Sequence, residues 1–320
     1  MAHAPRPLDL PVRDGVSPSA VAVPAGPWPT VLEFLAARLP VLSPDDWAAR
    51  LAAGDVLGDD GKPVAATAAC RAGQRLHYYR YLPDEPEAPQ SEAIVFQDEW
   101  LVVADKPHFM PVTPSGRFLH RSLLVRLKRR LGLAHLSPIH RIDRETAGLV
   151  AFAVQPATRA AYQGLFRERA VEKMYEAIAP YRPELALPCT RDSRIEAEPE
   201  RFFLSHEAPG QPNSHTRIEL AAVRGALAHY KLYPLTGQRH QLRIHMAALG
   251  VPIMGDSFYP EVRHGPGDPD DTDAPLQLLA SHLAFKDPVT GQRREFNSGL
   301  KLNLATAETA EATDTARPVR

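Results

Sequence analysis

The sequence predicts an α+β domain built on a mixed, mainly antiparallel sheet with inserted helices, preceded by a small α/β module. Short apolar segments paired across turn residues alternate with amphipathic segments of helical period. The 32 prolines among 320 residues favour many stiff connections over long helices. A segment rich in proline and glutamate, residues 83–90, divides the chain into two units. Many hairpins with helices between them are typical of the α+β class.

The N-terminal part of the chain is predicted to contain an arm and a module. Residues 1–25 are rich in proline and alanine and predict a flexible arm. The module, residues 26–82, is predicted to begin with a helix near 31–39. A second helix follows the cap residue Ser43 and ends at Gly54. Short strands are expected near 61–64 and 74–79, before the linker 83–90.

The larger domain spans residues 91–305, and a disordered low-complexity tail is expected over 306–320. Leu123, Leu124, Leu127 and Leu131 should form the inner face of a basic helix whose outer face carries Arg126, Lys128, Arg129 and Arg130. The remaining predicted elements are a hairpin at 94–104, a strand at 149–154, a helix at 157–169, a strand at 173–179, a hairpin at 216–233, a helix at 240–249 and a hairpin at 282–296.

Composition limits the function classes. The chain is 44% hydrophobic and 23% charged, as in soluble globular proteins. No apolar run approaches the roughly 20 residues of a membrane span, and the N-terminus has no secretion-signal pattern. Cys70 and Cys189 match no metal or redox spacing and are expected to be free thiols. We therefore expect a cytoplasmic protein without membrane attachment.

Charge is concentrated in one part of the chain. The net charge is −1, but eight Lys/Arg residues and one acid, Asp143, occupy residues 115–144. Such a cluster fits a polyanion bound at one surface, and a solvated helix face is the alternative interpretation. Within the cluster, Asp143 lies between Arg141 and Arg144. Because arginine keeps its charge, we expect this carboxylate to stay ionised as a nucleophile or general base.

Four segments in order resemble one family. Residues 140–150, HRIDRETAGLV, are similar to the signature HRLDxxTSGLL around the catalytic aspartate of RluA-type pseudouridine synthases. DKPHFMPVTP at 105–114 is similar to KPxGMxVHP, with Phe109 for glycine and Thr113 for histidine. EKMYEA at 172–177 is similar to KxYxA. Residues 235–259 resemble TGRxHQIRVHLxxxGxPIxGDxxY, with Gln238 for the first arginine. A weaker fifth segment, at 278–280, has leucine where the family usually carries the histidine of LHA.

The resemblance implies an RNA pseudouridine synthase with that family's sheet core. Such an isomerase breaks the N1 glycosidic bond of a uridine, rotates the uracil and rejoins it through C5, with no cofactor and no metal. Asp143 corresponds to the essential carboxylate, and Arg243 to the basic residue that pairs with it in place of the adjacent Arg144. Two charge-assisted bonds from the Arg243 guanidinium would fix the orientation of this carboxylate and hold its pKa down. Tyr175 corresponds to the tyrosine that stacks on uracil or relays the C5 proton, and Leu278 could wall the base pocket.

The implied partner is structured RNA, either ribosomal or transfer RNA; the sequence indicates neither the uridine nor the oligomeric state. The target base must be flipped out of its stack. Arg141 matches the family arginine that fills the vacated space or contacts a phosphate. Further RNA-binding candidates are Lys106, Lys173, Arg126, Arg129 and Arg130.

The module at 26–82 resembles the S4 RNA-binding module in its order of elements. Residues 43–62, however, contain five aspartates against two cations, Arg50 and Lys62. Phosphate binding requires the opposite charge. We therefore interpret this unit as a degenerate S4-like fold with a weak or lost grip on RNA.

Two other functions remain as alternatives. The first is a catalytically idle RNA-binding protein of the same fold. The second is a carboxylate glycosidase, which needs a second carboxyl group as proton donor, with Glu145 or Asp256 as candidates. A metal site is not expected at His240 and His245, because their spacing and the absence of an intervening glutamate do not match HExxH.

Overall fold

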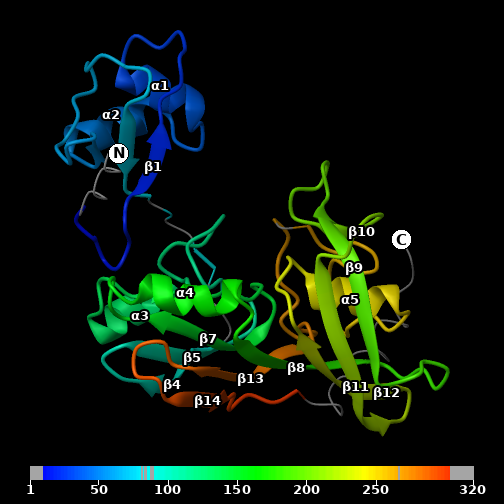
Figure 1. The fold of residues 1–320 in the computed structure, drawn as a ribbon. Coiled ribbons are helices and arrows are strands. Elements are labelled where there is room, and N and C mark those ends of the chain that lie inside the picture. Colours follow the sequence, from blue (N-terminus) through cyan, green and yellow to red (C-terminus); the bar gives the residue numbers. More distant parts are fainter. Residues whose placement is uncertain (1–9, 81, 83–84, 87–89, 266, 303–320) are drawn as a thin grey trace.

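A computed structural model describes residues 10–80, 82, 85–86, 90–265 and 267–302. Within them the chain forms a three-stranded sheet in the N-terminal module and an 11-stranded sheet in the larger domain (Figure 1). Most of the predicted linker and the whole predicted tail at 306–320 lie outside the described residues. The mixed, mainly antiparallel α+β architecture predicted from the sequence is confirmed.

The N-terminal module packs two helices against a small antiparallel sheet of order β1-β3-β2. Its elements are β1 (Ser19–Ala22), α1 (Val31–Arg38), α2 (Pro44–Ala52), β2 (Val56–Leu57) and β3 (Arg75–Tyr78). The Thr30 side chain caps α1, and Ser43 with Asp46 forms a capping box on α2. Trp47 and Phe34 are buried between the helices and the sheet.

Two predictions for this region are wrong. Residues 19–22 were expected in a flexible arm, but they form β1 and pair with β3, so the module begins earlier than residue 26. Residues 61–64 form no strand, because Pro63 makes only an isolated bridge to Leu57. The S4 likeness itself stays a prediction.

The larger domain follows the predicted order of hairpins and helices. Its elements are β4 (Ala93–Gln97), β5 (Leu101–Lys106), α3 (Leu123–Leu131), β6 (Ser137–Pro138), β7 (Ala147–Ala153), α4 (Arg159–Arg167), β8 (Val171–Pro180), β9 (Cys189–Ala197), β10 (Ser205–Ala208), β11 (Ser214–Arg224), β12 (Leu227–Pro234), α5 (Gln241–Ala248), β13 (Leu278–Lys286) and β14 (Arg293–Asn297). The sequence analysis missed β6, β9 and β10, and it placed the start of β13 four residues late.

The sheet runs in the order β10-β9-β11-β12-β8-β13-β7-β5-β4, with β14 on β13 and β6 on β7. The pairing of β13 with β7 is parallel, and the other strand pairs of the described residues are antiparallel. Side chains of β5 alternate between two cores: Leu101 and Val103 pack with α4, and Val102 with α3. The parallel junction therefore lies inside the sheet, next to strands that are covered on both faces.

Helix α3 contacts the N-terminal module as well as its own domain. Leu123 and Leu127 are buried against the sheet, as predicted, and Gly132 ends the helix at φ +67°. Val125 packs on the other side against Val16. Lys128 was predicted to point outward, but it is only 9% exposed, with Arg159 of α4 among the charges near it.

Candidate active site

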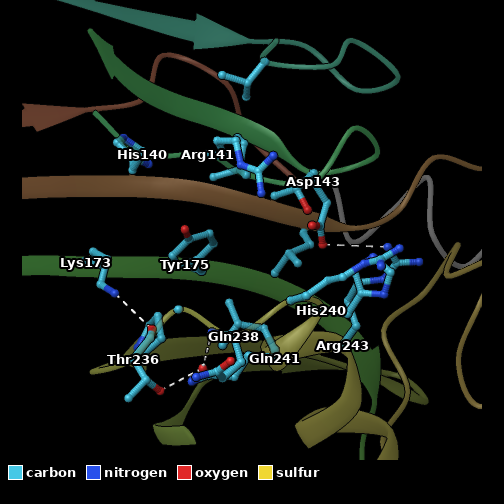
Figure 2. A pocket seen from close by; sticks show the side chains of 18 of the residues that line it. His140, Arg141, Asp143, Lys173, Tyr175, Thr236, Gln238, His240, Gln241 and Arg243 are labelled. Carbon is cyan, nitrogen blue, oxygen red and sulfur yellow. Dashed lines mark hydrogen bonds and ion pairs between the residues drawn. The ribbon is translucent and has the colours of Figure 1, made fainter. Parts of the chain in front are cut away.

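A pocket of about 970 Å³ opens where the parallel junction of the sheet meets the loop between β12 and α5 (Figure 2). Its wall comes from the turn before β7, the first half of β8, the start of β13 and the N-terminal part of α5. These segments are far apart in sequence and meet only because β7, β13, β8 and β12 are neighbours in the sheet. The motifs that resemble the family therefore converge on one cavity.

Asp143 lies in the turn that leads into β7. The backbone N–H of Thr146 donates to the Asp143 carbonyl at 3.2 Å and closes this turn. Two residues further on, Gly148 has φ +113°, and a Cβ there would lie 2.3 Å from the Ala280 carbonyl oxygen. Only glycine permits this approach of β7 to β13. The glycine of the motif thus brings the Asp143 turn beside β13.

Tyr175 and Leu278 reach the pocket from the two strands next to this turn. Leu278 is opposite Ala177, and Tyr175 is opposite Ala280, in the β13–β8 register. Figure 2 shows the Tyr175 ring projecting from β8 into the cavity. Burial, and next the charge of Asp143, raise the pKa of the Tyr175 hydroxyl, so it stays protonated.

Arg243 is the central cation of the site and is 1% exposed. Its Nε and Nη2 donate to the two carboxylate oxygens of Asp256 at 2.8 and 2.6 Å, and its Nη1 donates to Glu145 at 2.8 Å. Asp143 lies 3.8 Å from the same Nη1, an ion pair rather than a hydrogen bond. The prediction that Arg243 pairs with Asp143 is confirmed in this form. The predicted two-bond grip is wrong, because those bonds go to Asp256.

The electrostatics of Asp143 differ from the expectation. Burial raises the pKa of the Asp143 carboxyl, and the charge of Asp256 raises it further. The charges of Arg243 and Lys106 lower it. The expectation that arginines hold this pKa down is therefore wrong: the burial outweighs their charge. A raised pKa makes the carboxylate a stronger base and nucleophile once it is ionised.

The two arginines beside Asp143 in sequence have different surroundings. Arg144 turns away and donates to both oxygens of Asp270 at 2.7 Å, with a further bond of 3.1 Å to Glu145. Arg141 is exposed and lines the pocket. The expectation that Asp143 pairs with the distant Arg243 rather than with Arg144 therefore holds.

Lys106 was expected to bind phosphate, but its side chain is fully buried. Its Nζ donates to the carbonyls of Pro107 and Arg144 at 2.9 and 3.0 Å. Burial lowers the pKa of Lys106 to about 7, although the charges of Glu145 and Asp143 oppose this shift. Lys106 thus supports the turn that carries Asp143 and lies outside the pocket lining.

Gln241 fixes the loop between β12 and α5. Its Oε1 accepts from the Thr236 hydroxyl at 2.8 Å and from the Gln238 backbone at 3.0 Å, while its Nε2 donates to Thr216 at 2.9 Å. The Thr236 carbonyl in turn accepts from Lys173 Nζ at 3.0 Å. This network, visible in Figure 2, holds a loop over the pocket with Lys173 at its edge.

Further cations line the pocket that the sequence analysis did not single out. They are Arg167 at the end of α4, Arg169 between α4 and β8, and Arg239 in the β12–α5 loop. Arg169 lies three residues before the KxYxA-like segment, and Arg239 lies inside the fourth motif, so closeness to the motifs was the available signal. By contrast, the predicted RNA-binding residues Arg126, Arg129 and Arg130 lie outside the pocket lining.

Phe109 occupies the glycine position of the first motif. It has φ +63°, a conformation that glycine adopts without strain and that a phenylalanine rarely takes. The ring is 7% exposed and lies under the Arg144 guanidinium at 5.8 Å. This departure from the motif is therefore accommodated beside the turn that carries Asp143.

The histidines of α5 are neutral and hydrogen-bonded. Nδ1 of His240 lies 2.9 Å from the Tyr259 hydroxyl, and burial lowers the pKa of His240 to about 3. His245 contacts Ser193, Ser214 and Thr216, and burial lowers its pKa to about 4. The part of the chain that the structure describes has no His, Cys, Asp and Glu cluster suited to a metal ion. Nor does it include a helix long and apolar enough to span a membrane.

Comparisons of sequence and of structure relate this chain to known proteins. The family described as RNA pseudouridylate synthase matches residues 100–248. An uncharacterized RNA pseudouridine synthase of Synechocystis sp. is 30% identical over 74% of this chain and 80% of its own length. The dual-specificity RNA pseudouridine synthase RluA of Haemophilus influenzae is 33% identical over 64% of this chain and 91% of its own. Among solved structures, human RNA pseudouridylate synthase domain containing 4 has a TM-score of 0.52 and 25% identity over 68% of this chain and 91% of its own.

Proposed function

Because this chain belongs to the RluA-type RNA pseudouridine synthases, isomerases that act on RNA, we propose that it converts specific uridines of structured ribosomal or transfer RNA to pseudouridine with Asp143 as catalytic carboxylate. Proteins similar to this chain include a dual-specificity RNA pseudouridine synthase and, in Vibrio cholerae, tRNA pseudouridine synthase C. The observation that carries the proposal is the Asp143 carboxylate at the pocket, 3.8 Å from the buried Arg243 guanidinium.

The reaction needs one carboxylate at the sugar. Asp143 either attacks C1′ or removes a sugar proton while the C1′–N1 bond breaks and uracil leaves with the bonding electrons. The uracil then rotates and C5 bonds to C1′, as the Asp143 carboxylate leaves C1′ or returns its proton to the sugar. C5 loses its proton and N1 takes one up, so the product is an isomer of the starting uridine. Arg243 keeps a positive charge beside Asp143 throughout, because Asp256 and Glu145 hold its guanidinium in place.

Tyr175 and Leu278 are proposed to hold the base. The Tyr175 ring offers a face on which an extruded uracil can stack, and its protonated hydroxyl can pass on the C5 proton as a relay. Leu278, 3% exposed, gives the pocket an apolar wall. Such a wall excludes water, which would otherwise capture the cleaved sugar.

RNA is proposed to bind over the cations of the pocket rim. Arg141 and Lys173 keep the roles expected from the sequence, and Arg169 and Arg239 join them. Lys106 is not one of the proposed RNA-binding residues, because its amine is buried and donates to two backbone carbonyls. Extruding the target uridine costs a few kcal/mol, which contacts of these cations with flanking phosphates can offset. We place the enzyme in the cytoplasm, in line with its two free cysteines.

The glycosidase alternative lacks a proton donor. Both oxygens of Asp256 accept from Arg243, and Glu145 accepts from Arg243 and Arg144. Carboxylates occupied in this way have no proton to give to a leaving group. The idle RNA-binding alternative would leave Asp143, Tyr175 and Arg243 assembled in one pocket without a role.

The experiment that tests the proposal maps pseudouridine in unmodified transfer RNA and ribosomal RNA transcripts after incubation with the purified protein. We expect conversion of one or a few uridines by the wild type and, for Asp143→Asn, a loss of about 10⁴-fold or more with RNA binding retained. Asp192→Asn, a matched change at an exposed carboxylate paired with His215, should be fully active. Conversion by Asp143→Asn at the wild-type rate would refute the catalytic role. No conversion by the wild type in either RNA would refute the proposed function.

A further inference from the structure

An aromatic side chain is presented to solvent at the edge of the pocket. Phe202 lies in the connection between β9 and β10 and is 77% exposed. These two strands rise above the rest of the sheet beside α5 in Figure 1. A phenyl ring gains free energy when it leaves water, so an exposed one next to a binding pocket is a candidate contact for a ligand.

The backbone around Phe202 is held in place. Arg239, which lines the pocket, donates from Nη1 to the Phe202 carbonyl at 2.5 Å. The Leu204 N–H donates to the Arg201 carbonyl at 2.7 Å, and the Glu198 N–H to the Leu204 carbonyl at 3.1 Å. The ring is thus exposed on an ordered turn, so a ligand would not have to order this segment.

A row of rings connects Phe202 to the catalytic cation. Phe202 meets Phe203 edge to face, with centroids 5.7 Å apart and planes at 82°. Phe203 lines the pocket and lies 5.4 Å from Phe258, over which the Arg243 guanidinium sits at 4.8 Å. Two aromatic contacts and one cation–π contact therefore connect the exposed ring to Arg243, the residue that pairs with Asp143.

We propose that Phe202 is a stacking platform for an unpaired base of the RNA substrate, next in the chain to the uridine that enters the pocket. The proposal rests on the proposed function, because it assumes an RNA strand across this rim. Every base has a π-face that can lie on a phenyl ring. The exposed Arg239, bound to the Phe202 carbonyl, adds a positive charge beside the ring for the phosphate of the stacked nucleotide. Recognition of splayed single-stranded bases by aromatic rings is how many proteins select RNA.

The first test compares Phe202→Ala with Phe202→Trp on the transcript that the wild type modifies. We expect Phe202→Ala to raise KM about 5- to 150-fold, the effect of removing one stacked base, with kcat at saturating RNA unchanged. Phe202→Trp, which keeps an aromatic ring at this position, should have the KM of the wild type. Val223→Ala, which truncates an exposed apolar side chain on β11 outside the pocket lining, should leave both constants unchanged.

The second test uses binding alone and does not depend on turnover. Oligouridylate is titrated into Phe202→Trp and, as the control, into Val223→Trp. We expect quenching of the new tryptophan in Phe202→Trp only. Quenching without any pseudouridine formation by the wild type would refute the proposed function but support the stacking site. Phe202→Ala with a wild-type KM, or Phe202→Trp without quenching, would overturn the stacking proposal and leave the ring as a contact for a protein.

Discussion

Two basic regions of this molecule differ in what their charges do. Helix α3 carries Arg126, Arg129 and Arg130 within about one and a half helical turns. The pocket cations, in contrast, come one or two at a time from separate elements. On α3, Arg126 donates to the buried carboxylate of Glu92 at 2.6 Å. The Arg129 side chain passes beside Gly15 of the N-terminal module.

The pocket rim has the opposite character. Arg141, Arg169 and Arg239 are separated by many residues in sequence, but they line one cavity and are exposed. A polyanion follows charge in space, not along the chain. We therefore assign RNA binding to the pocket rim, and we assign α3 to the contact between the two domains.

The largest expected difference between the regions is in stability. Asp256→Ala removes the two-bond partner of Arg243 and should lower the free energy of unfolding by about 3–5 kcal/mol, because Arg243 is buried and its charge would be left uncompensated. Glu92→Ala removes the partner of Arg126 on α3. It should lower the free energy of unfolding by about 1 kcal/mol or less, since the Arg126 side chain is 30% exposed and can turn to water. Urea unfolding measures both.

Equal losses in the two variants would show that Arg243 depends on its partner no more than Arg126 depends on Glu92. Asp256→Asn keeps the shape of the side chain and removes its charge. It separates the loss of charge from the loss of packing, and its cost should lie close to that of Asp256→Ala.

A smaller effect concerns pH. Burial lowers the pKa of Lys173 to about 8, and the charge of Arg169 adds to this shift. A lysine is charged below its pKa, so RNA affinity should weaken by about three- to tenfold as the pH rises from 7 to 9. Lys173→Arg should bind equally well across this range, and Lys173→Gln should be weak at every pH. The same pH dependence in Lys173→Gln would contradict a role for this amine.

Parts of the fold followed from local signals. The predicted cap residue Ser43 begins α2, and Leu123 and Leu127 are buried on the predicted inner face of α3. The β11–β12 hairpin turns at Gly225, within the hairpin predicted at 216–233. These features depend on residues near in sequence, so the sequence was sufficient to predict them.

Other features depended on contacts between distant segments. The sequence could not show that Asp256 would take the two bonds of Arg243, or that Arg144 would turn to Asp270. Lys106 resembled a phosphate ligand because burial cannot be seen from the motif. Strand β1 was missed because its partner, β3, lies more than fifty residues further along the chain. In each case a charge or strand found a partner that only the folded sheet brings near.

The measurement that tests the contrast between the two regions most directly is the salt dependence of RNA affinity. Each lost phosphate contact lowers the slope of log Kd against log salt by about 0.7 to 0.9. Arg141→Gln with Arg169→Gln should therefore lower the slope by about 1.5, and Arg129→Gln with Arg130→Gln should leave it almost unchanged. A lower slope in the α3 pair with an unchanged slope in the pocket pair would contradict the account and return RNA binding to the helix.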